Sequence, residues 1–220
     1  MTNIVEHQSR EDLEEFLACE FANDLCNALQ RHDRAGIALS GGSTPRPIYE
    51  RMSRDSRISW ERVDVTLADE RLTDPDSEDS NEHLVKTTLL TNAAAKARFF
   101  PLRSEGDLPC PVDTIILGMG EDGHFASLFP TAKELDAGLS SRDPAVLRMT
   151  PDPLPEGAPY PRMSLTLPTI LSIPIIRVAM TGKTKRQVFR EARQPGPAHE
   201  LPIRALIAAG HPHLTVHWAP

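Results

Sequence analysis

Residues 118–130, GMGEDGHFASLFP, combine the residue types best suited to acid–base chemistry. Three glycines and the order Asp-Gly-His predict a tight turn that presents one imidazole, that of His124. An imidazole titrates near neutral pH and can therefore serve as a general base. A lone histidine is more often structural than catalytic, but this one follows an apolar run and lies beside an acid. We predict that His124 is a catalytic base oriented by Asp122, with Gly120 as a candidate substrate contact.

Residues 40–44, SGGST, form a turn of small residues between an apolar run and a predicted helix. Such a turn exposes backbone N–H groups at the start of a helix, where an anion is favoured. We predict that Gly42, Ser43 and Thr44 bind a phosphate and that Gly41 is a candidate substrate contact. The alternative is a tight connection that binds nothing. The turn matches neither the GxGxxG nor the Walker A pattern.

Asp69, Glu70 and Arg71 follow a second apolar run. Adjacent charges are usually solvated, but here the run delivers them to the end of a predicted strand. A carboxylate–guanidinium cluster at that position can fix geometry or stabilise negative charge that develops during a reaction. We predict that Asp69 and Arg71 are catalytic, whereas Glu70 can be catalytic or structural. Asn81, which opens the next predicted helix, is a candidate substrate contact.

Two further cations, Arg162 and Lys183, each begin or precede a regular element after a loop. Either could be ordinary surface charge. Together with the Ser43–Thr44 turn they would form a three-sided phosphate pocket. We predict that both bind the phosphate, which would reconcile an acidic chain with an anionic ligand.

The spacing of His211, His213 and His217 resembles that of a metal cluster. On a strand the three side chains would project to one face with a gap, and no acid or cysteine completes a ligand set. We therefore expect no metal and no cofactor. The other histidines are expected at the surface: His7, His32, His83 and His199.

An alternation of helices and strands must position these polar segments. Amphipathic spacing predicts a helix over residues 9–31, capped by Ser9. Strands are predicted at 37–39, 63–67, 113–117, 162–167, 175–180 and 214–218, and further helices from Pro47 and over 81–90, 183–192 and 201–208. This order implies an α/β fold with a mostly parallel sheet. Ligands bind beyond the carboxyl ends of such strands, which is where the polar segments fall.

The composition excludes several classes of protein. The 220 residues include 24 Lys and Arg against 31 Asp and Glu, a net charge of −7. An acidic surface argues against nonspecific binding to nucleic acid or to anionic membranes. No apolar run approaches the roughly 20 residues that span a bilayer. We expect a single α/β domain over residues 1–220, as a monomer or weak homo-oligomer without nucleic-acid or membrane partners.

Three cysteines, Cys19, Cys26 and Cys110, form no CxxC pair and are odd in number. The first thirty residues lack the charged-then-apolar pattern of a signal peptide. Both observations favour reduced thiols and a cytoplasmic location. Cys19 and Cys26 lie seven residues apart on the predicted first helix, so we expect both in the core.

Together, five segments resemble the 6-phosphogluconolactonase family: SGGSTPRPIYE (40–50), DER with the later SN (69–71, 80–81), GMGEDGHFASLFP (118–130), RMSLTL (162–167) and TGKTK (181–185). They occur in the family order and span most of the chain. The resemblance implies a Rossmann-like, mostly parallel sheet flanked by helices, of the NagB/RpiA/CoA transferase-like class. It also implies hydrolysis of 6-phospho-D-glucono-1,5-lactone to 6-phosphogluconate in the oxidative pentose phosphate pathway, without metal or cofactor. The expected partner is this small sugar-phosphate lactone.

Two other functions stay open. Glucosamine-6-phosphate deaminases of the same superfamily continue after the histidine through Asn-Glu-Pro, whose Glu assists ring opening. Here Leu128-Phe129-Pro130 takes that place, and Arg71 stands where deaminases carry Tyr; both differences favour the lactonase. A noncatalytic sugar-phosphate sensor is the second alternative, disfavoured because no basic helix-turn-helix segment precedes residue 36.

Overall fold

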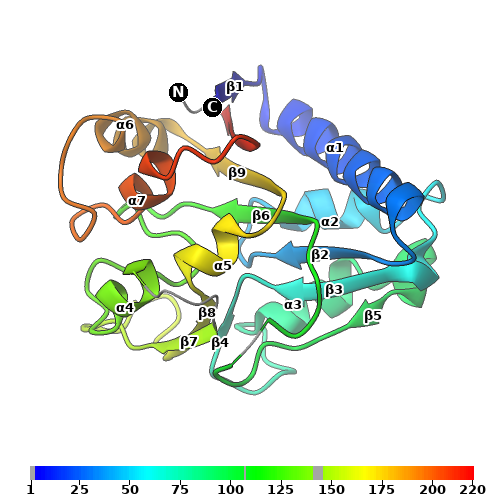
Figure 1. The fold of residues 1–220 in the computed structure, drawn as a ribbon, viewed down its shortest axis with the longest axis horizontal. Helices are drawn as coiled ribbons and strands as arrows, with labels where there is room; N and C mark the ends of the chain where they lie inside the picture. Colours follow the sequence, from blue (N-terminus) through cyan, green and yellow to red (C-terminus); the bar gives the residue numbers. More distant parts are fainter. Residues whose placement is uncertain (1–2, 107, 141–145) are drawn as a thin grey trace.

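The computed structural model describes residues 3–106, 108–140 and 146–220. Its centre is a seven-stranded sheet in the order β1-β10-β9-β6-β2-β3-β5 (Figure 1). The strands are β1 (Asn3–Glu6), β2 (Ala35–Leu39), β3 (Val63–Leu67), β5 (Arg98–Phe99), β6 (Thr114–Gly118), β9 (Ile175–Thr181) and β10 (Leu214–Ala219). Each pairing described within this sheet is parallel, which confirms the predicted fold class.

The central strands form because short apolar runs are covered on both faces. All five residues of β2 and of β3 are buried, as are the first four of β6. Strands buried on both faces usually read as continuous apolar runs, as β2 does, whereas β3 also buries Asp64, paired with Arg34 and Arg98, and Thr66, bonded to Phe100 O. Because β2, β6 and β9 pair in parallel, their carboxyl ends meet at one edge of the sheet.

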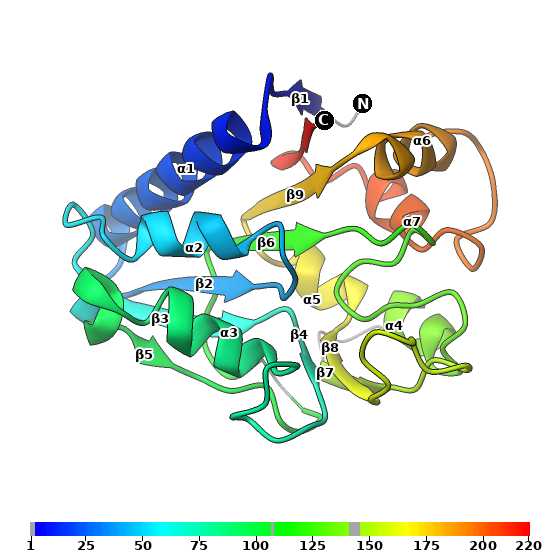
Figure 2. The ribbon, with the colours of Figure 1, turned by 180° about the vertical axis from the view of Figure 1, so that it is seen from behind.

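Helices cover both faces of this sheet. α1 (Arg10–Arg31), α2 (Arg46–Met52) and α3 (Asn81–Thr88) pack side by side on one face, which Figure 2 views from the front. The Ser9 hydroxyl accepts from the Asp12 N–H at 3.1 Å and caps α1 as predicted. On the other face lie α5 (Leu167–Leu171) and α7 (Ile203–Ala208), with α6 (Lys183–Ala192) packed on β9 and α7, while α4 (Leu135–Ser140) lies beside α5.

A second, antiparallel sheet was not anticipated. It has the order β4-β8-β7, where β4 is Asp69–Arg71, β8 is Arg162–Leu165 and β7 is Val146–Met149. Ala68 joins the two sheets: its N–H donates to Leu39 O at 2.8 Å and its carbonyl accepts from Leu165 N–H at 2.9 Å. The residues DER therefore form a strand of their own rather than the end of β3.

Other differences from the predicted elements are small. The predicted strand over 162–167 stops at Leu165 because the Thr166 side chain caps α5. The sequence analysis missed β1, β5 and β7. Cys26 is only half-buried and Cys19 is exposed, so the core position expected for them is wrong. Within the described residues no helix is long and apolar enough to cross a membrane. A single domain over the whole chain stays a prediction.

Candidate active site

A cavity of about 240 Å³ lies at the carboxyl ends of β2, β6 and β9. We call it the carboxyl-edge cavity. It is the location where α/β sheets bind ligands. Its lining comes from segments that are distant in sequence: Ser40, Gly41, Gly42, Ser43, Thr44 and Pro45 after β2, Asp69 and Arg71 of β4, Asn81 of α3, Gly118, Met119, Gly120, His124 and Ala126 after β6, Ala179 of β9 and Lys185 of α6.

The turn after β6 presents the predicted base. The His124 Nδ1 lies 2.6 Å from Asp122 Oδ1, and the His124 N–H donates to the same oxygen at 3.2 Å. A Cβ at Gly120 would lie 2.2 Å from His124 Nδ1 and 2.5 Å from Asp122 Oδ1, so only glycine fits beside this pair. Because Asp122 engages Nδ1, the Nε2 atom of His124 is the nitrogen left for chemistry in the cavity.

Electrostatics support this arrangement. Partial burial raises the pKa of Asp122, but the hydrogen bond and the charge interaction with His124 outweigh it and hold that pKa below its ordinary value. The carboxylate is therefore ionised at neutral pH and accepts the Nδ1 proton of the imidazole. In a neutral ring, that tautomer leaves Nε2 as a proton acceptor.

Asp69 and Arg71, the two neighbours of Glu70 in β4, both line the cavity. Arg71 Nη1 donates to Asp79 O at 2.6 Å, and its Nε is buried without a hydrogen-bond partner among the described residues. Asp69 is buried, and its Oδ2 accepts from the Ser127 hydroxyl at 2.6 Å. A guanidinium and a carboxylate thus lie on the same wall of the cavity.

Glu70 turns away from the cavity, since successive side chains of a strand alternate between its faces. Its carboxylate accepts from the backbone N–H groups of Arg71, Asn81 and Glu82 at 2.6, 2.8 and 2.7 Å. Burial raises the pKa of Glu70, although these three hydrogen bonds oppose that rise. Glu70 is therefore structural: it caps α3 and fixes β4 against that helix.

Asn81 lies at the junction of these segments. Its Nδ2 donates to Asp69 O at 2.7 Å, and a Cβ at Gly41 would lie 1.9 Å from its Oδ1. Asn81 Oδ1 and Ser40 Oγ are buried and, like Arg71 Nε, have no partner in the described part of the chain. Buried polar atoms are normally hydrogen-bonded. These three belong to residues that line the cavity, whereas two other unpartnered atoms of the described residues, Arg162 Nε and Arg204 Nε, belong to residues outside its lining. Ser40 was not singled out from the sequence, because nothing distinguishes it from a turn residue.

The Ser43–Thr44 turn lines the same cavity, with Gly42 at a φ of 104°. α2 begins directly after it, without a side-chain cap, but it has only seven residues and a correspondingly small dipole. An adjoining hollow of about 220 Å³ shares Gly42, Ser43, Arg71 and Asn81 and adds the exposed Arg46. Arg46, in the sequence STPRP, is a cation that the sequence analysis overlooked.

Comparison with known proteins places this site in a family. The family model described as glucosamine-6-phosphate isomerases/6-phosphogluconolactonase matches residues 8–111 and 102–218. The chain belongs to this family. It is 37% identical to a 6-phosphogluconolactonase of Caulobacter vibrioides (96% of this chain, 94% of the relative) and 39% identical to one of Mesorhizobium japonicum (93% and 90%).

Solved structures of the family agree with this membership. A 6-phosphogluconolactonase of Shewanella baltica has a TM-score of 0.91 at 32% identity, covering 100% of this chain and 98% of that one. A monomeric glucosamine-6-phosphate deaminase has a TM-score of 0.79 at 20% identity, which shows a shared fold alone. The predicted family is thus confirmed, and fold similarity by itself does not separate its two activities.

Arg162, predicted from the family's RMSLTL segment, does not line the carboxyl-edge cavity. It is 4% exposed, its Nη2 donates to Ala158 O at 2.9 Å, and its guanidinium carbon lies 5.9 Å from the centre of the Phe129 ring. Burial lowers the pKa of Arg162. The register of β8 on β4 sets Arg162 opposite Arg71, and its buried side chain packs behind the residues that line the cavity. Its predicted contact with the phosphate stays a prediction.

Lys183, from the family's TGKTK segment, is also outside the cavity. It is the first residue of α6 and its side chain is exposed, whereas Lys185 lines the cavity. Two residues along a helix differ by about 200° in direction, so the two lysines cannot face the same side. Burial lowers the pKa of Lys185, and Glu121 and Asp122 partly oppose that effect.

Ser127, the only hydroxyl in the family segment after His124, is fully buried. Its hydroxyl donates to Asp69 and its N–H donates to Ser164 Oγ at 3.0 Å. A serine held in this way cannot reach a carbonyl carbon in the cavity. The arrangement favours attack by water over a covalent acyl-enzyme.

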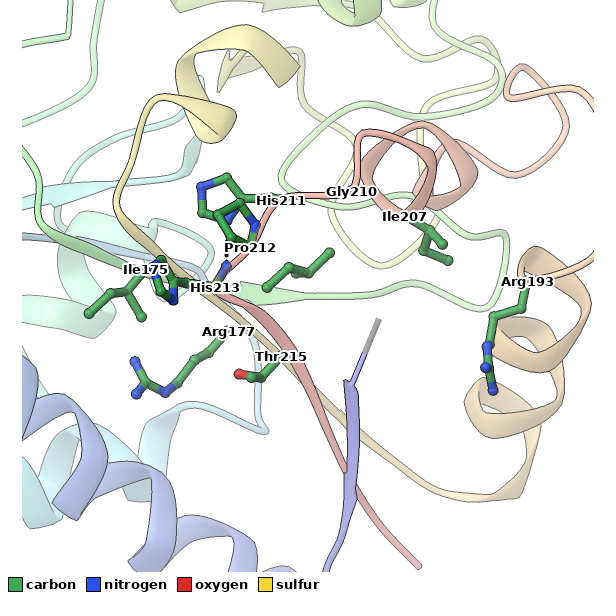
Figure 3. Close-up of a pocket in the computed structure, with 10 residues that line it drawn as sticks. Ile175, Arg177, Arg193, Ile207, Gly210, His211, Pro212, His213 and Thr215 are labelled. Carbon is green, nitrogen blue, oxygen red and sulfur yellow. Dashed lines mark hydrogen bonds between the residues drawn. The ribbon is translucent and has the colours of Figure 1, made fainter. Parts of the chain in front are cut away.

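A second, larger hollow of about 660 Å³ lies at the amino ends of β9 and β10, and we call it the amino-edge cavity (Figure 3). His211 and His213 belong to the turn that precedes β10, not to the strand, so the common face expected for the three C-terminal histidines is wrong. His217 lies in β10 with its Nδ1 3.2 Å from His7 Nε2, so His7 has a partner that the sequence did not suggest. Nowhere in residues 3–106, 108–140 and 146–220 do three His, Cys, Asp or Glu side chains converge as metal ligands.

Proposed function

We propose that this protein hydrolyses 6-phospho-D-glucono-1,5-lactone to 6-phosphogluconate in the oxidative pentose phosphate pathway; its relatives are named 6-phosphogluconolactonases. The observation that carries the proposal is the His124–Asp122 pair, with Nδ1 engaged at 2.6 Å and Nε2 left for the cavity that Arg71 and the Ser43–Thr44 turn also line. Lactone hydrolysis requires an oriented base and a cation near the carbonyl oxygen. A phosphorylated lactone also needs a polar turn that can bind its phosphate.

The proposed reaction begins when His124 Nε2 takes a proton from a water molecule. The oxygen of that water forms a bond to the lactone carbonyl carbon, C1, and the carbonyl oxygen becomes an oxyanion that Arg71 stabilises. The bond between C1 and the ring oxygen then breaks, and the ring oxygen takes the proton back from the imidazolium. The product is an open-chain acid with a free hydroxyl. Asp122 holds the imidazole throughout.

The phosphate of the substrate is proposed to lie against Gly42, Ser43 and Thr44. Lys185 replaces Lys183 as its proposed cation, because Lys185 is the lysine that lines the carboxyl-edge cavity. Charge-assisted hydrogen bonds to a phosphate fix the position of the rest of the molecule. Gly41, Asn81 and Asp69 then bound the sugar ring, where a carboxylate and an amide can bind hydroxyl groups.

A deaminase is less compatible with the site. Phe129 occupies the position where the deaminase pattern has its Glu. The centre of its ring lies 4.1 Å from the centre of the His124 ring. An apolar ring cannot share a proton with the histidine. Incubation with glucosamine 6-phosphate should therefore release no ammonia above a blank.

The decisive experiment measures lactone hydrolysis against its spontaneous rate. Lactone made by enzymatic oxidation of glucose 6-phosphate is supplied to the protein, and acid production is followed in a weakly buffered solution. We expect hydrolysis well above the background at nanomolar protein. Binding of 6-phosphogluconate in a calorimeter without any acceleration of hydrolysis would instead indicate a sensor.

A cytoplasmic location and a monomeric or weakly associating state remain predictions. Gel filtration with light scattering over a hundredfold range of protein concentration tests the second. A tight dimer at the lowest concentration would contradict it.

A further inference from the structure

Phe129 contacts the proposed catalytic base directly. The centres of the Phe129 and His124 rings are 4.1 Å apart and their planes are inclined by 32°. Phe129 is 8% exposed and is not among the residues that line the carboxyl-edge cavity. It therefore touches His124 without facing the substrate.

The chain folds back to make this contact. Ala126 has a φ of 47°, and the N–H of Leu128 donates to Phe125 O at 3.0 Å, which closes a tight turn between His124 and Phe129. A residue other than glycine in the left-handed region costs conformational energy, so the surrounding structure must hold this turn.

Phe129 in turn rests on Arg162. The guanidinium carbon lies 5.9 Å from the ring centre, and the guanidinium is fixed by its bond to Ala158 O and by the register of β8 on β4. The three side chains thus form a stack, His124–Phe129–Arg162, that runs from the cavity into the second sheet. This stack gives Arg162 a place in the site although it does not line the carboxyl-edge cavity.

The hydrogen bond to Asp122 fixes one atom of the imidazole but leaves the ring free to tilt about that contact. Gly120 lies against the Nδ1 edge. Phe129 supplies contact with the plane of the ring, which the hydrogen bond cannot provide. Together they define the direction in which Nε2 points.

We propose that Phe129, backed by Arg162, is a positioning residue that sets the orientation of the His124 imidazole for proton transfer. The inference rests on the proposed function for its kinetic readout. Misdirecting a base affects the chemical step more than binding, because binding does not involve Phe129.

The kinetic test compares Phe129→Leu with Phe129→Tyr. Loss of the ring should lower kcat for lactone hydrolysis roughly tenfold with KM changed less than about twofold, and Tyr should restore kcat to within about threefold of the parent. Phe129→Met serves if the Leu variant folds poorly. In a His124→Ala background, Phe129→Leu should cause no further loss, since Phe129 acts through His124. An unchanged kcat, a parallel rise of KM, or a loss that persists without His124 overturns the proposal.

Phe21→Leu is the matched control. Phe21 is a buried ring beneath another buried arginine, Arg177, at 5.3 Å, and it lies on α1 away from His124. This variant should lose stability while keeping kcat. If Phe21→Leu lowers kcat as much as Phe129→Leu does, the loss of kcat follows from a general loss of stability of the fold, and the proposal is overturned.

A spectroscopic measurement keeps this inference separate from the proposed function. In nitrogen-15 labelled protein, the Nδ1 proton of His124 should give a resolved signal in the parent, in Phe129→Tyr and in Phe21→Leu, and should broaden in Phe129→Leu. An unchanged signal in Phe129→Leu overturns the positioning role even if the protein hydrolyses no lactone. Absence of hydrolysis by the parent defeats the proposed function alone.

Discussion

The two cavities at opposite edges of the sheet differ in whether the polar residues that line them have partners, and their sizes do not reveal this. The amino-edge cavity is the larger, about 660 Å³ against about 240 Å³. Its buried cation, Arg177, is ion-paired with Asp24 and, at 3.0 Å, with Glu20, and the N–H of His213 donates to His211 Nδ1 at 3.3 Å. Arg193 lies on the far side of the hollow from Arg177 (Figure 3).

The carboxyl-edge cavity has the opposite character. Its histidine is oriented by an acid, and three of its lining residues, Ser40, Arg71 and Asn81, each hold a buried polar atom without a hydrogen-bond partner in the described ranges. Hydrogen-bonding capacity that folding leaves unused is available to a ligand, whereas capacity spent on internal ion pairs stabilises the fold. We therefore place the proposed function at the cavity whose lining residues hold unpartnered polar atoms and not at the larger cavity.

Replacing a histidine at each edge gives the largest expected contrast. His124→Ala should lower kcat for lactone hydrolysis by about 10²–10⁴-fold, the usual contribution of a general base. His213→Ala, at the amino-edge cavity, should keep kcat and KM within about twofold. Initial rates corrected for spontaneous hydrolysis measure both. Full turnover by His124→Ala would remove the base from its proposed role.

The two arginines should separate activity from stability. Arg71→Met should lower kcat about a hundredfold, because the oxyanion loses its cation. Arg177→Met leaves the buried carboxylate of Asp24 without its partner and should lower the free energy of unfolding by about 3 kcal/mol while kcat persists. Urea unfolding and saturating kinetics on both variants check this. Equal losses of kcat in the two variants would erase the distinction between the edges.

The lysines of α6 give a smaller contrast. Lys185→Ala should raise KM for the lactone and weaken binding of 6-phosphogluconate about tenfold, since a charge-assisted bond to phosphate is lost. Lys183→Ala, two residues away and exposed, should change both by less than about twofold. Calorimetry with the product supplies the binding constants. A larger effect at Lys183 would return the phosphate to the residue first predicted from the sequence.

His217 provides the smallest effect, a dependence of stability on pH. Burial, followed by the charges of His7 and Arg177, lowers its pKa from 6.5 to about 3. Below pH 6.5 the unfolded chain therefore binds a proton that the folded chain does not, and stability falls as the pH drops toward 3. The slope from this group is about 1 kcal/mol per pH unit. Unfolding free energies at pH 7, 6, 5 and 4 should fall less steeply for His217→Gln, and an unchanged slope would contradict the assignment.

Much of the fold could be predicted because its signals are local. The helix over 9–31, the strand over 63–67 and the helix over 183–192 follow from apolar spacing and capping within each segment. The second sheet could not be predicted, since it depends on antiparallel pairing of β4 with β8, about ninety residues away, and β7 is a strand only because it pairs with β8 in turn.

The features of the candidate site likewise fall into those set within one segment and those that depend on distant segments. The pairing of Asp122 with His124 is set by two residues of one turn, and it was predicted from that turn alone. Proposing Lys185 in place of Lys183 required the rotation of α6 about its axis, and finding Arg162 outside the cavity lining required the packing of the second sheet. The cap that Glu70 places on α3 depends on both β4 and that helix, so the tripeptide alone left its role open.

Ala68 has a consequence for how activity is acquired. Its N–H bonds to the parallel sheet and its carbonyl to the antiparallel one, so a single residue joins the two sheets. His124 and the Ser43–Thr44 turn follow strands of the first sheet, while Arg71 lies on a strand of the second. A refolding chain that has completed only the parallel sheet would hold the proposed base and the proposed phosphate turn but lack the proposed oxyanion cation. We therefore expect recovery of turnover to require docking of the two sheets and to trail the recovery of helical signal.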